Sequence, residues 1–180
     1  MKKLILFAAI LFAGVSVVKA DEPEHKQTVS TTLTVELNAI QSIIVEGSPK
    51  ITYSTADHYG LGTSSGEIAG HLSVVSAGGY VIRVEAADLE NEGSDVISAS
   101  SINVKATAGA NSSGTVGTPL ESGVTLAEST KDFITGSKGA VHQKYNVTYT
   151  GDKDFKYMVN YNADSDQVYT TEVFYTIAPN

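Results

Sequence analysis

The chain has 180 residues, of which 42% are hydrophobic and 18% charged, and its formal net charge is −8. This is the composition of a globular protein, and it excludes a collagen or a long disordered tail. The excess of acidic residues disfavours nucleic acid and anionic lipid surfaces as partners, because phosphate binding needs clustered Lys and Arg.

Residues 1–20 have the layout of a secretory signal peptide. Lys2 and Lys3 precede an apolar run, and a small-residue site, Val18-Lys19-Ala20, follows it. We therefore expect cleavage after Ala20 and a single exported domain, residues 21–180, that is secreted, periplasmic or held at the cell surface. Its net charge would be about −11, because the leader holds three of the 12 basic residues and none of the 20 acidic ones. No later apolar run reaches the roughly 20 residues of a membrane-spanning helix.

The sequence contains no cysteine. A disulfide therefore cannot stabilise the exported domain, and thiol nucleophiles and thiolate metal sites are excluded. We expect packing and strand pairing alone to hold the fold together.

Apolar and polar residues alternate with period two through most of the domain, which predicts β-strands with one buried face. The first such segment is 28–37, where Val29, Leu33, Val35 and Leu37 share one face. The pattern recurs in residues 41–46, 50–55, 71–76, 80–86, 96–106, 123–129, 143–150, 155–161 and 167–178.

About ten short strands separated by turn residues predict an all-β fold. We expect an antiparallel β-sandwich of immunoglobulin-like or Greek-key type. Helical periodicity is not convincing in any window, so we expect almost no helix. Residues 60–70 and 109–119 are rich in small residues and are expected to be the long loops.

Two patterns could carry chemistry. Residues 62–66 match the G-x-S-x-G pattern around Ser64, with His58 and His71 nearby, but a nucleophile elbow needs a following helix and the sequence predicts none. Asn162, Asp164 and Asp166 are weak candidates for calcium ligands, because alternating oxygens can wrap a hard cation. The same residue types are the preferred residues of tight turns. We expect no other metal or cofactor.

Tyrosine is concentrated near the end of the chain. Five tyrosines lie within 25 residues and could form a ligand platform, or could simply fill strands as large amphipathic residues. They are Tyr145, Tyr149, Tyr157, Tyr161 and Tyr169.

The exported domain begins with polar residues 21–27, continues with the alternating segment 28–37 and ends with a tyrosine-bearing strand. These features together make it resemble bacterial fimbrial subunits and related surface β-sandwich proteins. The resemblance implies assembly by strand addition, with Val29, Leu33, Val35 and Leu37 as the donor residues. Residues 28–37 could equally be the first strand of a self-contained sandwich. The short connection through residues 38–39 favours this second interpretation.

We therefore expect a non-enzymatic structural or binding protein of the bacterial cell surface, such as a filament subunit that forms a homopolymer. Its partners would be other protein subunits or surface ligands. The alternatives are a soluble secreted module that binds carbohydrate or protein and, more remotely, a periplasmic hydrolase.

The leader gives a first prediction. When the gene is expressed in a Gram-negative host, mass spectrometry of the exported protein should find Asp21 at the N-terminus, because the small-residue site ends at Ala20. A cytoplasmic protein that keeps Met1 would contradict the assignment of the compartment.

Overall fold

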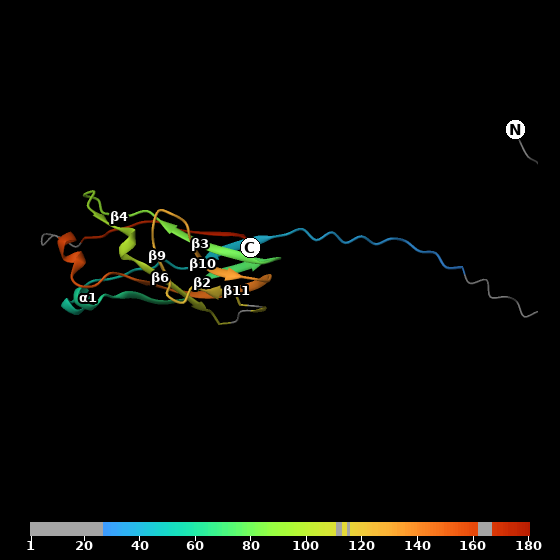
Figure 1. Ribbon diagram of the computed structural model, residues 1–180, viewed down its shortest axis with the longest axis horizontal. Coiled ribbons are helices and arrows are strands. Elements are labelled where there is room, and N and C mark those ends of the chain that lie inside the picture. Colours follow the sequence, from blue (N-terminus) through green and yellow to red (C-terminus); the bar gives the residue numbers. More distant parts are fainter. Residues whose placement is uncertain (1–26, 111–112, 115, 162–166) are drawn as a thin grey trace, which may run out of the picture. The chain divides into compact units, whose positions relative to one another are not determined.

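The computed structural model describes residues 27–110, 113–114, 116–161 and 167–180, and it divides the chain into two compact units, residues 1–36 and 37–180. The described residues of the second unit form an all-β fold with one short α-helix, α1 (Ala56–Leu61), and two 3-10 segments, η1 (Ala99–Ser101) and η2 (Lys156–Asn160) (Figure 1). Among the described residues, no helix is long and apolar enough to cross a membrane.

Two antiparallel sheets form the body of this unit, and a two-stranded sheet joins β4 (Leu89–Glu90) to β5 (Val96–Ile97). The larger sheet has the order β1 (Gln41–Val45), β2 (Ser64–Ser76), β11 (Ala140–Thr150), β6 (Asn103–Ala108) and β9 (Val124–Thr125), and β7 (Ser113–Gly114) also pairs with β11. The smaller sheet has the order β12 (Val173–Pro179), β3 (Tyr80–Ala86), β10 (Lys131–Gly136) and β8 (Thr118–Pro119).

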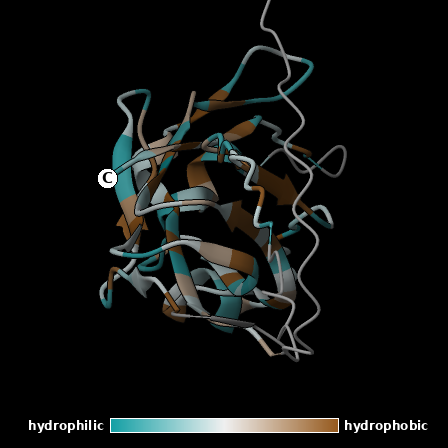
Figure 2. Cartoon of the chain, turned by 90° about the vertical axis from the view of Figure 1, so that its right-hand side faces the viewer, coloured by the Kyte–Doolittle hydropathy of each residue, from teal (hydrophilic) through white to brown (hydrophobic). Residues whose placement is uncertain are grey.

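The core lies between the two sheets, as the alternation of apolar residues predicts. Val74 and Val147 from the larger sheet and Ile82 from the smaller one are completely buried in a single cluster. Hydrophobic stretches, brown in Figure 2, run along the strands. The antiparallel β-sandwich expected from the sequence is therefore confirmed, and the described residues contain little helix, as expected.

The second unit has two distinct ends. At the basal end lie the β2–β3 turn and the C-terminus, because the Asn180 amide donates to the Gly79 carbonyl and the Ala77 amide donates to the Ile40 carbonyl. At the opposite, apical end lie α1, η2 and the β4–β5 pair (Figure 1). There the Asn160 side chain donates to the Val96 carbonyl.

Several expected elements differ from those observed. Residues 28–37 form no strand, so the expectation that they open the chain's own sandwich is wrong. The first strand is instead β1, which takes the edge position beside β2, whose other side is paired with β11. Residues 50–55 are also not a strand, and 155–161 contain η2 instead. Residues 60–70 are not a long loop, since β2 begins at Ser64.

A series of buried hydrogen bonds joins β2 and β11 of the larger sheet to β12 of the smaller one. His71 on β2 is 1% exposed, and its Nδ1 donates to the Glu46 carbonyl. Its Nε2 therefore accepts from the Tyr149 hydroxyl, at 2.9 Å, and the Tyr149 and Tyr175 hydroxyl oxygens lie 2.6 Å apart. Burial lowers the pKa of His71 below its ordinary value of 6.5, so the imidazole is neutral in the folded protein.

The neutral state of His71 predicts a pH-dependent stability. The contribution of neutral His71 to the free energy of unfolding is complete above the ordinary pKa near 6.5. It is lost as the pH falls below that value, because the unfolded state then binds a proton at His71 that the folded state does not bind. In urea unfolding, the free energy of unfolding should fall less between pH 7.5 and pH 5 in His71→Gln than in the unchanged chain. His142→Asn, at an exposed histidine, is the control and should keep the full pH dependence. An equal pH dependence in His71→Gln and the unchanged chain would contradict the prediction.

Tyr80 packs directly over Gly136, its partner across the β3–β10 pair. A Cβ atom added at Gly136 would lie only 2.4 Å from the Tyr80 ring. The hydroxyl of that ring also lies 2.6 Å from the Tyr145 hydroxyl in the opposite sheet, so the ring cannot shift without disturbing a buried contact.

We therefore expect Gly136→Ala to destabilise the fold by about 1–3 kcal/mol, the usual cost of overpacking a core. Gly78→Ala is the matched control, because nothing lies within 4 Å of a Cβ added there. Thermal unfolding of both variants checks the prediction, and equal stability of the two would refute the packing argument.

Candidate functional site

Strands β1 and β12 form an open edge of the sandwich, which we call the β1–β12 edge. β1 ends the larger sheet and β12 ends the smaller one, and the two strands contact each other. Within the described part of the chain, β1 pairs only with β2 and β12 only with β3. One side of each strand therefore offers backbone donors and acceptors to an added strand.

The core is incompletely covered along this edge. Ile43 on β1 and Val173, Tyr175 and Ile177 on β12 pack against the core but are only half-buried, although the alternation of β12 turns its three residues to the inner face. Inward-facing residues of the central strands, such as Val74, are completely buried. An extended segment that carried apolar side chains at alternate positions would cover the exposed remainder.

The four candidate donor residues have such side chains. Val29, Leu33, Val35 and Leu37 lie in a segment without helix or strand, and their exposed fractions are between 72% and 89%. Each exposed Val or Leu forgoes roughly 1.5–3 kcal/mol of burial. The segment therefore combines strand-forming alternation with four exposed apolar side chains on one face.

The lengths of segment 28–37 and of strand β12 are also compatible. Ten extended residues, 28–37, span about 33 Å at roughly 3.3 Å per residue, and the seven residues of β12 span about 23 Å. The segment can therefore follow the whole of β12. Tyr175 in the middle of that strand is held from behind by the Tyr149 hydroxyl, which fixes the position of its ring.

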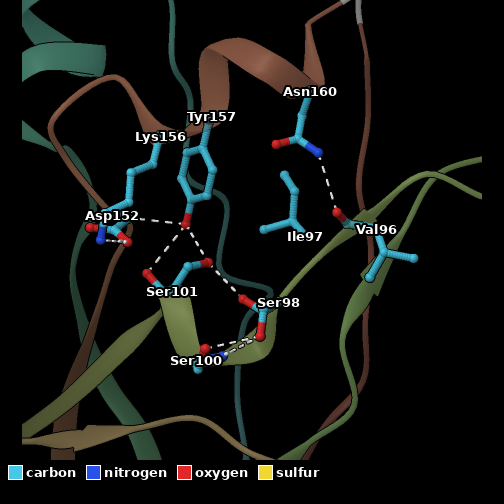
Figure 3. A pocket seen from close by; sticks show the side chains of 9 residues that line it. All are labelled: Val96, Ile97, Ser98, Ser100, Ser101, Asp152, Lys156, Tyr157 and Asn160. Carbon is cyan, nitrogen blue, oxygen red and sulfur yellow. Dashed lines mark hydrogen bonds and ion pairs between the residues drawn. The ribbon is translucent and has the colours of Figure 1, made fainter.

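A polar recess of about 340 Å³ lies at the apical end (Figure 3). At its wall the Tyr157 hydroxyl donates to Ser101 Oγ at 2.7 Å and accepts from the Asp152 amide, while Lys156 Nζ donates to Asp152 Oδ2 at 2.7 Å. The hydrogen bond from Lys156 lowers the pKa of Asp152. The charged groups at this wall, Asp152 and Lys156, therefore form an ion pair with each other.

The serine and histidines considered for hydrolysis lie in other arrangements. Ser64 opens strand β2 rather than a helix, and its Oγ accepts from the Gly66 amide. His71 uses both ring nitrogens in the core, and His58 Nδ1 contacts the Ser54 hydroxyl. The geometry of a nucleophile elbow is therefore not formed around Ser64.

The calcium candidates Asn162, Asp164 and Asp166 lie outside the described residues. Among the residues that are described, no group of three or more His, Asp or Glu side chains is placed to hold a metal ion. The tyrosines do not make one platform, since Tyr145 and Tyr149 are buried in the core and Tyr161 is exposed.

Sequence reasoning missed an exposed apolar cluster at the apical end. We call it the apical cluster and define it as Leu61, Val96, Phe155, Met158 and Val159, which are between 47% and 88% exposed. Residues 155–161 alternate like a strand, so the pattern predicted one apolar face in a sheet. A signal against that prediction is Asp152-Lys153-Asp154, a turn-forming sequence directly before it.

Comparison with known proteins found no matching protein-family model and no matching curated protein sequence.

Proposed function

We propose that the chain is a non-enzymatic structural protein of the bacterial cell surface, exported by residues 1–20, whose copies assemble by β-strand addition. Residues 28–37 of one copy act as the donor strand and complete the β1–β12 edge of the next. Since each copy has one donor and one acceptor, the product is a homopolymer.

The observation that carries this proposal is the match between an uncovered apolar face and an incompletely covered core. Val29, Leu33, Val35 and Leu37 are exposed, and the inner-face residues of β12 are only half-buried. Backbone pairing with the free side of β12 would supply affinity, and the alternate apolar side chains would supply selectivity.

The polar recess at the apical end supports the alternative of a carbohydrate-binding module less well. Its hydroxyl, amide and carboxylate groups already bond to one another, as Ser98 does to Ser100 and Asn160 to the Val96 carbonyl. A sugar would have to replace these bonds, and the recess is open to solvent.

Strand addition predicts that only one face of the donor segment matters. The double substitution Leu33→Asp and Val35→Asp should abolish assembly, because it removes two buried apolar side chains worth roughly 3 kcal/mol or more. A loss of this size weakens the affinity between copies by at least about 100-fold. Size-exclusion chromatography with light scattering of the exported protein measures the effect.

Thr32→Asp with Thr34→Asp is the matched control, because it places the same charges on the opposite face of the same segment. The control chain should assemble like the unchanged one. Equal loss in both variants, or assembly retained in both, would contradict strand addition by residues 28–37.

A further inference from the structure

The connection between the donor strand and its own sandwich is very short. Leu37 is the last donor residue, and the Ile40 carbonyl already accepts the Ala77 amide at the basal end. Only Asn38 and Ala39 intervene. Three Cα–Cα steps span at most about 11 Å. If strand addition occurs as proposed above, on which this inference rests, the basal end of the donor copy must lie directly against the acceptor where Leu37 leaves the edge.

The direction of pairing selects the end of the acceptor. Every pair of strands among the described residues is antiparallel. β12 runs from the apical end toward the basal end, since Val173 lies opposite Ala86 and Pro179 opposite Tyr80, beside the β2–β3 turn. An antiparallel donor runs the other way, so that its Leu37 leaves at the apical end of the acceptor.

The residues just before β12 lie against the apical strand β4 and the residue that follows β3. Thr170, three residues before β12, forms a bridge with Glu90 of β4, and Thr171 Oγ1 donates to the Ala87 carbonyl. β5 and α1 both contact η2 at this end of the unit (Figure 1). The donor copy would therefore meet the surface that carries the apical cluster.

The apical cluster is held in place by backbone contacts. The Phe155 amide donates to the Tyr59 carbonyl and the Asp154 amide donates to the Gly60 carbonyl. The Phe155 ring lies over Gly60, 3.1 Å from a Cβ atom added there. Asp154 and Phe155 both have φ near +58°, an unfavourable conformation for residues other than glycine. The segment thus keeps exposed apolar side chains in a fixed, strained arrangement.

We infer that the apical cluster is a second contact between consecutive copies, covered by the basal end of the donor copy around its exposed Ile40. The occupant is a second copy of this chain, because the short connection after Leu37 leaves no room for another molecule between the two sandwiches. The contact makes assembly of whole chains stronger than binding of the donor strand alone.

The test compares a donor peptide with a whole donor chain. The acceptor is the full chain with Leu33→Asp and Val35→Asp, which cannot donate, and the probe is a fluorescent peptide of residues 28–37. Adding Met158→Asp and Val159→Asp to this acceptor should leave peptide affinity within about twofold. In chains with an intact donor segment, the same two substitutions should speed dissociation of assembled copies at least tenfold.

Leu120→Asp is the control, because Leu120 is another exposed apolar residue and follows β8, at the edge of its sheet opposite β12. It should change neither measurement. Unchanged dissociation of the Met158→Asp, Val159→Asp chain, with normal peptide binding, would overturn the apical contact and leave strand addition intact. Failure of the peptide to bind any acceptor, with monomeric unchanged chains, would overturn the proposed function and the contact with it.

A second measurement does not depend on loss of binding. The chain has no cysteine, so Ile40→Cys with Val159→Cys introduces the only two thiols. A short bifunctional maleimide should then give a ladder of covalent oligomers. Ile40→Cys with Leu120→Cys should give none, and equal ladders from both pairs, or no ladder from the first, would refute the apical contact.

Discussion

Burial between two sheets is the constraint on which the rest of this structure depends, because a chain without cysteine has no covalent links to add to it. Central strands satisfy the constraint almost fully, since inward side chains such as Val74 on β2 and Ile82 on β3 are completely buried and Ile68 on β2 is partly buried. Edge strands satisfy it only in part. β1 and β12 each have a pairing partner on one side, and their inner-face residues stay half-buried. The same requirement that forms the sandwich therefore leaves one of its edges suited to a further strand.

Buried tyrosine hydroxyls add directional contacts to this non-directional burial. Tyr80 contacts Tyr145 from the opposite sheet, and Tyr149 links His71 on β2 to Tyr175 on β12. Burial raises the pKa of Tyr149 to about 12, so its hydroxyl keeps its proton for these contacts at neutral pH. Hydrogen bonds of this kind fix how the two sheets align, because a shift would leave a buried hydroxyl without its partner. Much of the tyrosine enrichment thus serves the core.

Period-two alternation predicted the fold class and the central strands well. Residues 80–86 coincide with β3, and 143–150 lie within β11, because burial between two sheets imposes strict alternation on these strands. The start of β2 was missed, since Gly66 and Gly70 adopt positive φ inside the strand and register shifts occur between this region and β11. A glycine-rich stretch looks like a loop when its cross-strand partner is unknown.

The candidate site was only partly predictable for a related reason. Alternation identifies an apolar face but does not say which strand will cover it. The proposed donor residues Val29, Leu33, Val35 and Leu37 come from the sequence pattern, whereas the β1–β12 edge depends on topology. Residues 155–161 alternate as well, yet they form η2, because Asp154 and Phe155 turn the chain into left-handed backbone conformations before a strand could begin. The alternation of apolar and polar residues does not predict that turn.

In the proposed assembly, the β1–β12 edge has to accept the donor segment of another copy and reject other strands, since backbone pairing by itself is unselective. Alternate side chains provide the discrimination, because a strand shifted by one residue would place Thr32 and Thr34 against the half-buried core in place of Leu33 and Val35. Net negative charge adds a second barrier by keeping free copies apart in solution. Under these two conditions, strand pairing at the edge is stable only when several apolar side chains of the added strand become buried against the core at the same time. In the proposed assembly, the regular alternation of the donor segment, rather than its overall hydrophobicity, is therefore the property that would make strand addition selective.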